Sequence, residues 1–333
     1  MLSKVVVTQP IQATVLSYLR QHAEVHMNSG PNPFSREELI DNCKDAHGVM
    51  VFMTERIDKK FLENCKKIRI IAGALKGYNN ISIDECSDEN IPVTIVPDLL
   101  TEPTGELTVG LMIALARKVC AGDRYVRERN FPGWRPILYG QSLSKANVLV
   151  IGAGAVGKTV LRMLKGFDCN CFYVDPDPLP TSTEVELNCK RTELDTGLPT
   201  ADFVILALHL MPDTRHLVDA SFLAKMKTNS LLINPARGSL VHEKAVETAL
   251  SKKQISGYAA DTFEVEDWAL EDRPRSISSG LLTSERTVFT PHIGSAVREV
   301  REAIEYSAAK SLIDGINGRI SENTVNKKFL NFV

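Results

Sequence analysis

The sequence predicts an α/β protein with two doubly wound, Rossmann-like domains, each built on a parallel sheet with helices on both faces. Short runs of β-branched residues alternate with helical patterns along the whole chain, an arrangement typical of parallel sheets. The length of 333 residues suits two domains of ordinary size. A glycine-rich turn at residues 151–157 joins a strand to a helix and indicates a nucleotide site.

The first domain is expected to span residues 1–99 and to contain four strands. Apolar, β-branched runs predict these strands at residues 5–8, 49–52, 68–71 and 93–96. After the first strand, one helical face collects the apolar residues Ile11, Val15, Leu16 and Leu19. Ser35 and Glu38 have the spacing of a capping box, which predicts the start of a second helix.

The second domain is expected to span residues 100–296. A long apolar helix is predicted over 106–119, and it packs either within the chain or against a partner subunit. Further strands are predicted at residues 147–151, 172–174, 203–206, 231–233, 258–260 and 288–290. A last helix carries Val300, Ile304, Ala308 and Leu312 at four-residue spacing. Because this helix follows the completed second sheet, it is expected to return to the first domain, which would then comprise residues 1–99 and 297–333.

The composition excludes several classes of protein. Lys and Arg total 39 and Asp and Glu total 41, so the net charge is −2, which argues against a nucleic-acid binder and a polybasic membrane anchor. No apolar run is long enough to cross a membrane, and the first residues leave no room for a signal segment. The seven Cys residues are scattered without metal-ligand spacing, which predicts reduced thiols in a cytoplasmic protein without a metal site.

Gly152, Gly154 and Gly157 match the G-x-G-x-x-G pattern of dinucleotide-binding proteins. The first glycine allows the tight turn, the second lets the backbone approach a pyrophosphate, and the third lets the helix pack closely on the strand. The helix that follows offers free N–H groups and the positive end of its dipole to the phosphates. A glycine-rich turn without a ligand is the alternative, but the flanking strand and helix favour a nucleotide.

The strand after this turn ends at Asp175, 18 residues beyond Gly157. An acid at that distance can bond both ribose hydroxyls of NAD. Residues 176–180 supply no Arg or Lys for a 2′-phosphate, and the carboxylate would repel that phosphate. The sequence therefore predicts NAD, rather than NADP, as the cofactor.

Three polar segments follow late strands of the second domain. They are Asn-Pro-Ala-Arg-Gly at 234–238, Asp-Thr-Phe-Glu-Val-Glu at 261–266 and Pro-His-Ile-Gly-Ser at 291–295. Together with the glycine pattern, and in this order and spacing, they resemble the D-2-hydroxyacid dehydrogenase family, and the resemblance covers nearly the whole chain. It implies two doubly wound domains with the active site in the cleft between them, and a homodimer.

The same resemblance implies that Arg237 binds the substrate anion, that Glu266 is the acidic partner and that His292 is the acid/base. The residue types suit these roles, since a planar guanidinium can hold an anion through two parallel hydrogen bonds. Histidine can take a proton near neutral pH, and a neighbouring carboxylate stabilises the imidazolium. Taken singly, each side chain could be a solvated surface group, but their joint occurrence after a nucleotide pattern favours a site.

The resemblance also implies a set of cofactor contacts, in which Asp261 lies near the nicotinamide amide. These contacts are expected at Thr104, Gly152, Gly154, Ala155, Val156, Gly157, Asp175, Ala207, Leu208, Pro235, Ala236, Asp261 and Gly294.

Segments outside the shared motifs resemble most closely the phosphonate (phosphite) dehydrogenases within the family. These segments are 74–79, 131–134, 138–140, 266–268, 272–274 and 294–301. By that resemblance the substrate site or its surroundings also include Met53, Lys76, Gly77, Trp134, Tyr139, Ser295 and Arg301. Phosphite is a small, largely dianionic oxyanion, so more than one cation is expected to meet it. The alternative for Lys76 and Arg301 is an ordinary surface salt bridge. The alternative for Trp134 and Tyr139 is packing in the core.

The expected reaction is the NAD-dependent oxidation of phosphite to phosphate, in which the P–H hydrogen leaves as hydride while a water-derived oxygen attacks phosphorus. The alternative in the same class is a D-2-hydroxyacid dehydrogenase of the glyoxylate or hydroxypyruvate reductase type, with His292 taking the hydroxyl proton. A formate dehydrogenase fits less well, because that relative has an amide at the position of Glu266. An NAD-sensing, corepressor-like binding protein is the alternative from another class, although no docking tail is evident.

Overall fold

The computed structural model describes residues 2–96, 98–268 and 270–330. The chain divides into two compact units. The first unit comprises Met1–Leu100, Trp268–Asp272 and Ala296–Val333, and the second comprises Thr101–Asp267 and Arg273–Ser295. The main difference from the domains expected from the sequence is the segment Trp268–Asp272, which belongs to the first unit. The apolar tail residues Phe332 and Val333 lie outside the described residues.

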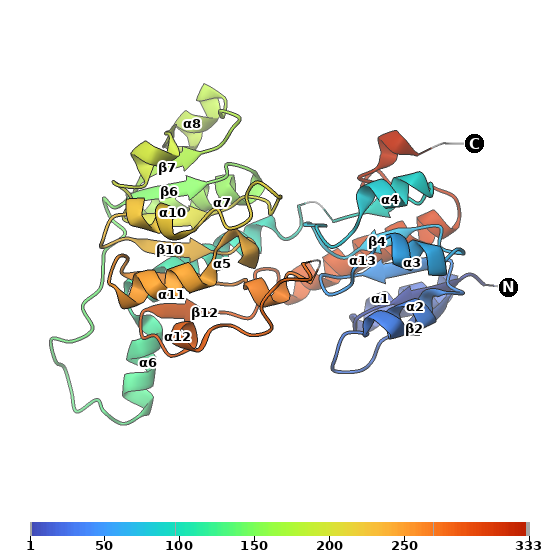
Figure 1. Cartoon of the computed structure of the whole chain (residues 1–333), viewed down its shortest axis with the longest axis horizontal. Coiled ribbons are helices and arrows are strands. Elements are labelled where there is room, and N and C mark those ends of the chain that lie inside the picture. Colours follow the sequence, from blue (N-terminus) through green and yellow to red (C-terminus); the bar gives the residue numbers. More distant parts are fainter. Residues whose placement is uncertain (1, 97, 269, 331–333) are drawn as a thin grey trace. The chain divides into compact units, whose positions relative to one another are not determined.

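The first unit is built on a five-stranded parallel sheet in the order β2-β1-β3-β4-β5 (Figure 1). Its strands are β1 (Lys4–Val7), β2 (Glu24–Met27), β3 (Gly48–Val51), β4 (Ile71–Gly73) and β5 (Val93–Thr94). Its helices are α1 (Ala13–His22), α2 (Arg36–Cys43), α3 (Lys59–Asn64), α4 (Ile83–Asp88) and α13 (Arg298–Ile316). The parallel α/β arrangement is the predicted one, and the strand order is that of a doubly wound sheet.

The capping box predicted at the start of α2 is present. The Ser35 hydroxyl accepts the backbone N–H of Glu38 at 3.2 Å, and a carboxylate oxygen of Glu38 accepts the backbone N–H of Ser35 at 2.8 Å. These reciprocal bonds satisfy two donors that the first helical turn leaves without partners. They fix the residue at which α2 begins.

The last helix, α13, returns to the first unit as the sequence predicted. It packs against α1, β3 and β4. Its residues Ile304, Ala308 and Leu312 are buried in one apolar cluster with Val5 and Val7 of β1. Because these side chains are buried there, the helix belongs to the core of the first unit although it follows the second unit in the sequence. Such burial is stabilising, by roughly 25 cal/mol per Å² of apolar surface.

The second unit is built on a seven-stranded parallel sheet in the order β12-β11-β10-β9-β6-β7-β8 (Figure 1). Its strands are β6 (Asn147–Ile151), β7 (Asn170–Val174), β8 (Cys189–Arg191), β9 (Phe203–Leu206), β10 (Leu231–Asn234), β11 (Gly257–Ala260) and β12 (Thr287–Phe289). Its helices are α5 (Thr101–Ala116), α6 (Val119–Arg127), α7 (Ala155–Leu164), α8 (Thr181–Leu187), α9 (Leu194–Gly197), α10 (Ala220–Lys225), α11 (Glu243–Ser251) and α12 (Ser279–Leu282).

The connections of this sheet determine where a ligand can bind. From β6 the chain adds β7 and β8 on one side, and it then crosses back to add β9, β10, β11 and β12 on the other. The order therefore reverses between β6 and β9. Doubly wound sheets bind ligands outside the carboxyl ends of their strands at such a switch point.

Helix α5 resolves the two alternatives left open for the long apolar helix. Its residues Met112 and Leu115 are buried in one cluster with Val148 and Val150 of β6. The helix packs against α7, β10 and β11 of its own unit. It begins at residue 101, five residues before the predicted start, and Pro103 fits because the first turn needs no intrahelical N–H bond there.

Several strands differ from the sequence prediction. The predicted strand at 68–71 begins only at Ile71, and β5 has two residues rather than four. Strands β2 and β8 were not predicted; they lie at the sheet edges and alternate or expose their side chains. Edge strands need no continuous apolar run, because one side of the strand has no neighbour to pack against.

In the described part of the chain, no helix is both long and apolar enough to span a membrane. All seven cysteines are free, and only Cys120 is not buried. No group of three His, Cys, Asp or Glu side chains suited to a metal ion exists among the described residues.

Candidate active site

The three polar segments singled out in the sequence lie together at the carboxyl edge of the seven-stranded sheet. Residues 235–238 follow β10, residues 261–266 follow β11, and residues 290–295 follow β12. These three strands are direct neighbours in the sheet. Parallel strands present their carboxyl ends on the same edge, so segments that are about 30 residues apart in sequence become adjacent.

His292 and Glu266 form a short, direct pair. Nδ1 of His292 lies 2.6 Å from Oε2 of Glu266, and the two side chains are 31% and 25% exposed. Because Nδ1 is occupied by the carboxylate, Nε2 is the ring nitrogen available to exchange a proton with a substrate. The backbone of His292 has a positive φ of 54° and is held by its N–H, which donates to the carbonyl of Asp261 at 2.8 Å.

Glu266 is fixed through both carboxylate oxygens. Its Oε1 accepts the backbone N–H of Phe263 at 2.6 Å, across the short 3-10 turn η3 (Glu264–Glu266). That turn is packed directly on the segment that carries Arg237. A Cβ added to Gly238 would lie 1.8 Å from the carbonyl carbon of Phe263, so only glycine permits this approach.

Arg237 is half-buried beside two carboxylates. One guanidinium nitrogen donates to the carbonyl of Ala236 at 2.8 Å. Burial lowers the pKa of the guanidinium, and the charges of Asp267 and Glu266 act in the opposite direction. The guanidinium therefore lies close to the carboxylate of the His292–Glu266 pair.

Asp261 organises the segment that contains His292. Its carboxylate accepts the backbone N–H groups of Ile293 and Gly294, each at 2.8 Å, and the hydroxyl of Thr290 at 2.6 Å. The side chain is only 1% exposed, and burial raises its pKa. Asp261 therefore determines the conformation of the loop after β12, in addition to the cofactor contact expected from the sequence.

The glycine turn fits a dinucleotide. Gly152 has a φ of +96°, and a Cβ there would lie 2.4 Å from the carbonyl oxygen of Ala207. A Cβ on Gly157 would lie 2.0 Å from the carbonyl oxygen of Gly152. Gly154 differs, because nothing lies within 4 Å of its Cβ position. The first and third glycines thus serve packing, and the second leaves open space where a pyrophosphate can approach the start of α7.

The remaining cofactor residues expected from the sequence surround the same edge. Asp175 follows β7, and its Oδ2 accepts the backbone N–H of Ala153 at 2.7 Å. Ala155 and Val156 open α7, Ala207 and Leu208 follow β9, Pro235 and Ala236 follow β10, and Thr104 lies in α5 beside Gly294.

Four of the substrate residues expected from the resemblance belong to the first unit. Met53 follows β3, and Lys76 and Gly77 follow β4. Nζ of Lys76 lies 3.1 Å from a carboxylate oxygen of Asp98. Arg301 lies in the first turn of α13, with its guanidinium 5.8 Å from the ring centre of Phe52. It also pairs with Glu305 at 3.6 Å. Both cations thus take part in ion pairs, which was the alternative to a substrate role.

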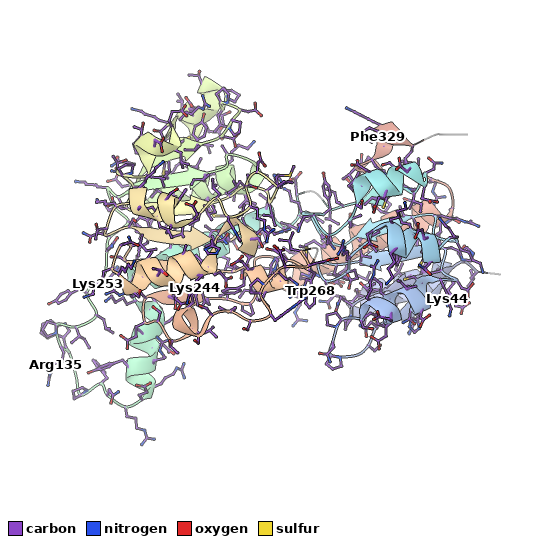
Figure 2. All side chains as sticks on the ribbon, in the orientation of Figure 1. Lys44, Arg135, Lys244, Lys253, Trp268 and Phe329 are labelled. Atoms are coloured by element: carbon purple, nitrogen blue, oxygen red, sulfur yellow. The ribbon has the colours of Figure 1, made fainter. Side chains whose placement is uncertain are left out.

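Ser295, the next expected substrate residue, directly follows the His292 loop in the second unit. The two aromatic residues lie elsewhere. Trp134 and Tyr139 are 81% and 76% exposed, on the segment that leaves α6. Arg135, next to Trp134, stands at the outer end of this segment in Figure 2.

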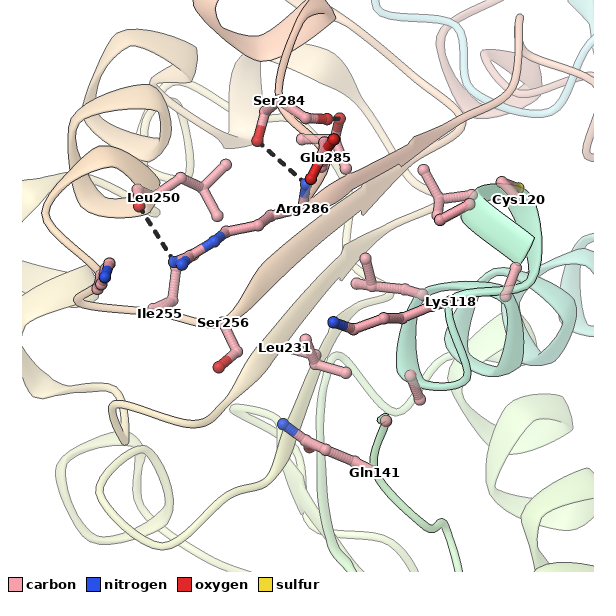
Figure 3. A pocket seen from close by; sticks show the side chains of 18 of the residues that line it. Lys118, Cys120, Gln141, Leu231, Leu250, Ile255, Ser256, Ser284, Glu285 and Arg286 are labelled. Carbon is pink, nitrogen blue, oxygen red and sulfur yellow. Dashed lines mark hydrogen bonds between the residues drawn. The ribbon is translucent and has the colours of Figure 1, made fainter. Parts of the chain in front are cut away.

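Tyr139 faces the opposite edge of the sheet from His292. It lines a cavity of about 1010 Å³ together with Leu231, Ser256 and Thr287, which stand at the amino ends of β10, β11 and β12. Figure 3 shows this cavity, with Lys118 and Gln141 pointing toward Leu231. Within one chain, therefore, the structure does not bring Trp134 and Tyr139 to the residues at the carboxyl edge.

Two features of the site were not found from the sequence. Asp267 is buried, and its carboxylate accepts the backbone N–H of Ser239 at 2.7 Å, which steadies the segment after Arg237. A second histidine–glutamate pair involves Glu264, two residues before Glu266, with Nε2 of His216 2.6 Å from Oε1 of Glu264. An acid-rich stretch at 264–267 was the only signal in the sequence, and it does not reveal which carboxylate faces which partner.

Comparisons with known proteins identify the family of the chain. Residues 109–294 match the family model described as "D-isomer specific 2-hydroxyacid dehydrogenase, NAD binding domain". A protein of Staphylococcus haemolyticus provisionally named a 2-hydroxyacid dehydrogenase is 32% identical over 327 residues, covering 98% of this chain and all of that one. A Staphylococcus aureus protein with the same provisional name is 33% identical over 326 residues, with the same coverage.

Solved structures show the same similarity. A protein of Thermus thermophilus superposes with a TM-score of 0.87 at 30% sequence identity, covering 97% of this chain and 99% of that one. The match of the NAD-binding model spans the glycine turn, the first two polar segments and the third as far as Gly294, so NAD is the cofactor of this site. From its sequence, its two parallel sheets and the residues at the carboxyl edge, the chain belongs to the D-isomer specific 2-hydroxyacid dehydrogenase family of oxidoreductases.

Proposed function

We propose that this protein is a dehydrogenase that transfers a hydride between NAD and a small anionic substrate, with His292 as the acid/base. The observation that carries the proposal is the 2.6 Å pair between Nδ1 of His292 and Oε2 of Glu266. It stands beside the half-buried Arg237, at the edge of the sheet that carries the glycine turn. A base, an anion-binding cation and a nucleotide turn are the parts that such a reaction requires.

The comparisons favour a 2-hydroxyacid as the substrate class, because the relatives that match the whole chain carry that name. In this reaction Arg237 holds the substrate carboxylate through two parallel hydrogen bonds. Nε2 of His292 would take the hydroxyl proton as the C–H hydrogen leaves as hydride, and a bound NAD would supply the hydride acceptor. Glu266 keeps the imidazole oriented and stabilises its protonated form. In the reverse direction the same atoms reduce a 2-ketoacid such as glyoxylate or hydroxypyruvate.

Phosphite is a rival proposal for the substrate, and it rests on residues outside the family motifs. Oxidation to phosphate breaks one P–H bond, forms one P–O bond from water and releases one proton. His292 would take that proton from the attacking water. Arg237, Lys76 and Arg301 would supply positive charge for the dianion, whereas a monocarboxylate needs less. The ion pairs Lys76–Asp98 and Arg301–Glu305 reduce this charge, so the cations must be tested directly.

One assay separates these substrates. Purified protein is incubated with NAD and phosphite, D-lactate, D-glycerate or formate in turn, and NADH formation is followed. Activity with phosphite alone supports phosphite as the substrate, and activity with hydroxyacids but not phosphite overturns it in favour of a 2-hydroxyacid. NAD binding without turnover of any substrate, including glyoxylate and hydroxypyruvate with NADH, would favour an NAD-sensing binding protein instead.

Lys76→Ala separates the two substrate proposals further. If phosphite is the substrate and Lys76 holds it, the KM for phosphite should rise roughly tenfold or more, as expected for a lost charge-assisted hydrogen bond. Asp98→Ala is the matched control, because it removes only the acidic partner of the Lys76 ion pair. An unchanged KM in the Lys76 variant would show that Lys76 forms only a surface salt bridge.

We also propose that the protein is a homodimer and that α6 with residues 128–141 forms part of the interface. None of the residues of α6 is buried. This segment exposes seven large apolar side chains, Val119, Val126, Phe131, Trp134, Ile137, Leu138 and Tyr139. Exposed apolar surface of this extent is typical of an interaction site. A substrate role for Trp134 and Tyr139 would then require a second copy.

Sedimentation velocity tests the dimer. The native chain should sediment at twice the monomer mass, and Trp134→Ser combined with Ile137→Ser should shift it toward the monomer. A native monomer at micromolar concentration would rule the dimer out.

We further propose a cytoplasmic location, which the seven unpaired thiols support.

A further inference from the structure

Arg191 places a positively charged side chain beside Asp175, although residues 176–180 contain no Arg or Lys. Arg191 is the last residue of β8 and pairs with Tyr173 of β7, so it stands at the carboxyl edge next to the end of β7. Its Nε and Nη2 donate to the carbonyl of Asp175 at 3.2 Å and 3.0 Å. Nη2 also donates to the carbonyl of Pro176 at 3.3 Å. The cation thus reaches the Asp175 loop from a neighbouring strand.

The carboxylate of Asp175 is engaged in another direction. Its Oδ2 accepts the backbone N–H of Ala153 in the glycine turn at 2.7 Å, and its Oδ1 accepts the backbone N–H of Asp177 at 3.0 Å. The hydrogen bonds of Arg191 go to the carbonyl oxygens of the loop and not to this carboxylate. The charged groups of Arg191 in β8 and Asp175 after β7 therefore lie close together without forming an ion pair.

This arrangement leaves Arg191 with an uncompensated charge. Carbonyl oxygens position a guanidinium but carry no net charge, and Arg191 is exposed and forms no ion pair among the described residues. A guanidinium has five N–H donors in a fixed plane, and it binds phosphate more strongly than it binds neutral acceptors. Donors on Nη1 take no part in the three bonds to the loop.

We propose that Arg191 is a determinant of cofactor choice: it is a resident cation for a ribose 2′-phosphate, and the carboxylate of Asp175 is what keeps that phosphate out. Selection against NADP then depends on one acidic group and not on the lack of a cation. The proposal rests on the NAD site and is independent of which substrate is oxidised. It predicts that removing the acid alone creates a site for a 2′-phosphate and that this new site depends on Arg191.

Binding of two adenine nucleotides to the full chain tests this without turnover. The probes are 2′,5′-ADP, which carries the 2′-phosphate, and 5′-AMP, which lacks it. Calorimetric titration at about 0.15 M salt compares the native chain with Asp175→Asn, Arg191→Gln and the combination of both. Asn keeps an oxygen that can accept the Ala153 N–H, and it removes the negative charge.

In the Asp175→Asn chain, 2′,5′-ADP should bind about tenfold more tightly than in the native chain, because the repulsion between like charges is gone. Adding Arg191→Gln should weaken 2′,5′-ADP by about tenfold, the effect of one charge-assisted hydrogen bond. The affinity for 5′-AMP should change less than twofold in that second step. The ratio of the two affinities therefore reports on the 2′-phosphate alone.

Lys190→Gln is the matched control. It removes one positive charge from the neighbouring position of β8, where alternation directs the side chain to the other face of the sheet. In the Asp175→Asn background it should leave 2′,5′-ADP binding within about twofold, since its side chain lies on the other face of the sheet from Arg191.

Two results would overturn the proposal. One is an equal loss of 5′-AMP and 2′,5′-ADP on Arg191→Gln, which would make Arg191 only a support for the loop. The other is 2′,5′-ADP affinity in the double variant as high as in Asp175→Asn. If Arg191→Gln fails to fold, Arg191→Met, which keeps the apolar stem, gives the same comparison, and circular dichroism checks the fold of each variant.

Discussion

Oε1 of Glu266 accepts the backbone N–H of Phe263 at 2.6 Å, while Oε2 of the same carboxylate lies 2.6 Å from Nδ1 of His292. The carboxylate is thus fixed by its own turn before it contacts the imidazole. The histidine receives both a defined orientation and a defined tautomer from this contact. As a result, Nε2 is the ring nitrogen that remains available to a substrate.

Replacing Glu266 by Gln should lower kcat by about a hundredfold, which is within the range of general acid–base catalysis. The amide oxygen can still accept the Phe263 N–H, but the amide NH₂ then faces Nδ1 and favours the tautomer with a proton on Nε2, which is no base. Steady-state kinetics should show the loss in kcat and little change in the affinity for NAD. Glu186→Gln, an exposed change on α8, should leave kcat unaltered. Equal kcat values for native and Glu266→Gln protein would exclude this role.

Arg237→Lys should raise the substrate KM by roughly tenfold or more, since an ammonium cannot reproduce the two parallel hydrogen bonds of a guanidinium. The change is measured from initial rates at varied substrate concentration. Arg162→Lys is the control, because Arg162 forms an exposed pair with Glu102 at 2.5 Å and such pairs contribute little. If the substrate KM of Arg237→Lys is no higher than that of the control Arg162→Lys, Arg237 has no anion-binding role.

Two glycines should respond in opposite ways to the same change. Gly154→Ala should leave the free energy of unfolding unchanged, since its Cβ position has nothing within 4 Å. It should weaken NAD binding, because the methyl group occupies the space in which the pyrophosphate approaches.

Gly238→Ala should instead destabilise the fold by roughly 1–3 kcal/mol, the usual cost of overpacking, because its Cβ would lie 1.8 Å from the Phe263 carbonyl carbon. Chemical denaturation and NAD titration separate the two effects. A stable Gly238→Ala chain with native kcat would mean that the contact with the Glu266 turn is not tight.

The raised pKa of Glu243 makes the free energy of unfolding depend on pH. Burial raises its pKa to about 7, and the neighbouring charges of Glu264, Asp267 and Glu266 add to the effect, while the backbone N–H of Glu264 opposes it. The folded chain therefore keeps a proton that the unfolded chain loses above about pH 4.5. The free energy of unfolding should consequently fall as the pH rises from about 4.5 to about 7.

Glu243→Gln should remove this decrease, because an amide resembles the protonated acid at every pH. Denaturant titrations at about pH 5 and about pH 8 provide the measurement. The variant should be similar to the native chain at the lower pH and more stable by up to roughly 3 kcal/mol at the higher pH. An identical pH profile for both proteins would show that Glu243 does not titrate in this range.

Much of the second unit followed from local sequence patterns. The strands at 147–151 and 203–206 were predicted at their observed limits, because buried parallel strands are continuous apolar runs. The glycine turn followed from spacing alone. The edge strands β2 and β8 did not, since half of their surroundings is solvent and their sequences alternate or carry charge.

The residue types of the candidate site could be predicted from the sequence, but the hydrogen bonds that hold those residues in place could not. The positions of Arg237, Glu266 and His292 followed from the family resemblance, and the structure adds the hydrogen bonds that fix them. The contribution of Asp267 to the Arg237 segment depends on a contact between residues 28 positions apart. The approach of Arg191 to Asp175 likewise arises from strand pairing, which a reading of residues 176–180 could not reveal.

The most direct test of the account is the rate of NADH formation by His292→Ala, measured by stopped flow with saturating NAD and the best substrate found in the assay. Loss of the base should slow hydride transfer by roughly 10²–10⁴-fold, while the affinity for NAD, measured by titration, stays within about twofold because the glycine turn is untouched. An unchanged rate in this variant would contradict the assignment of His292 as the acid/base and with it the mechanism proposed for this site.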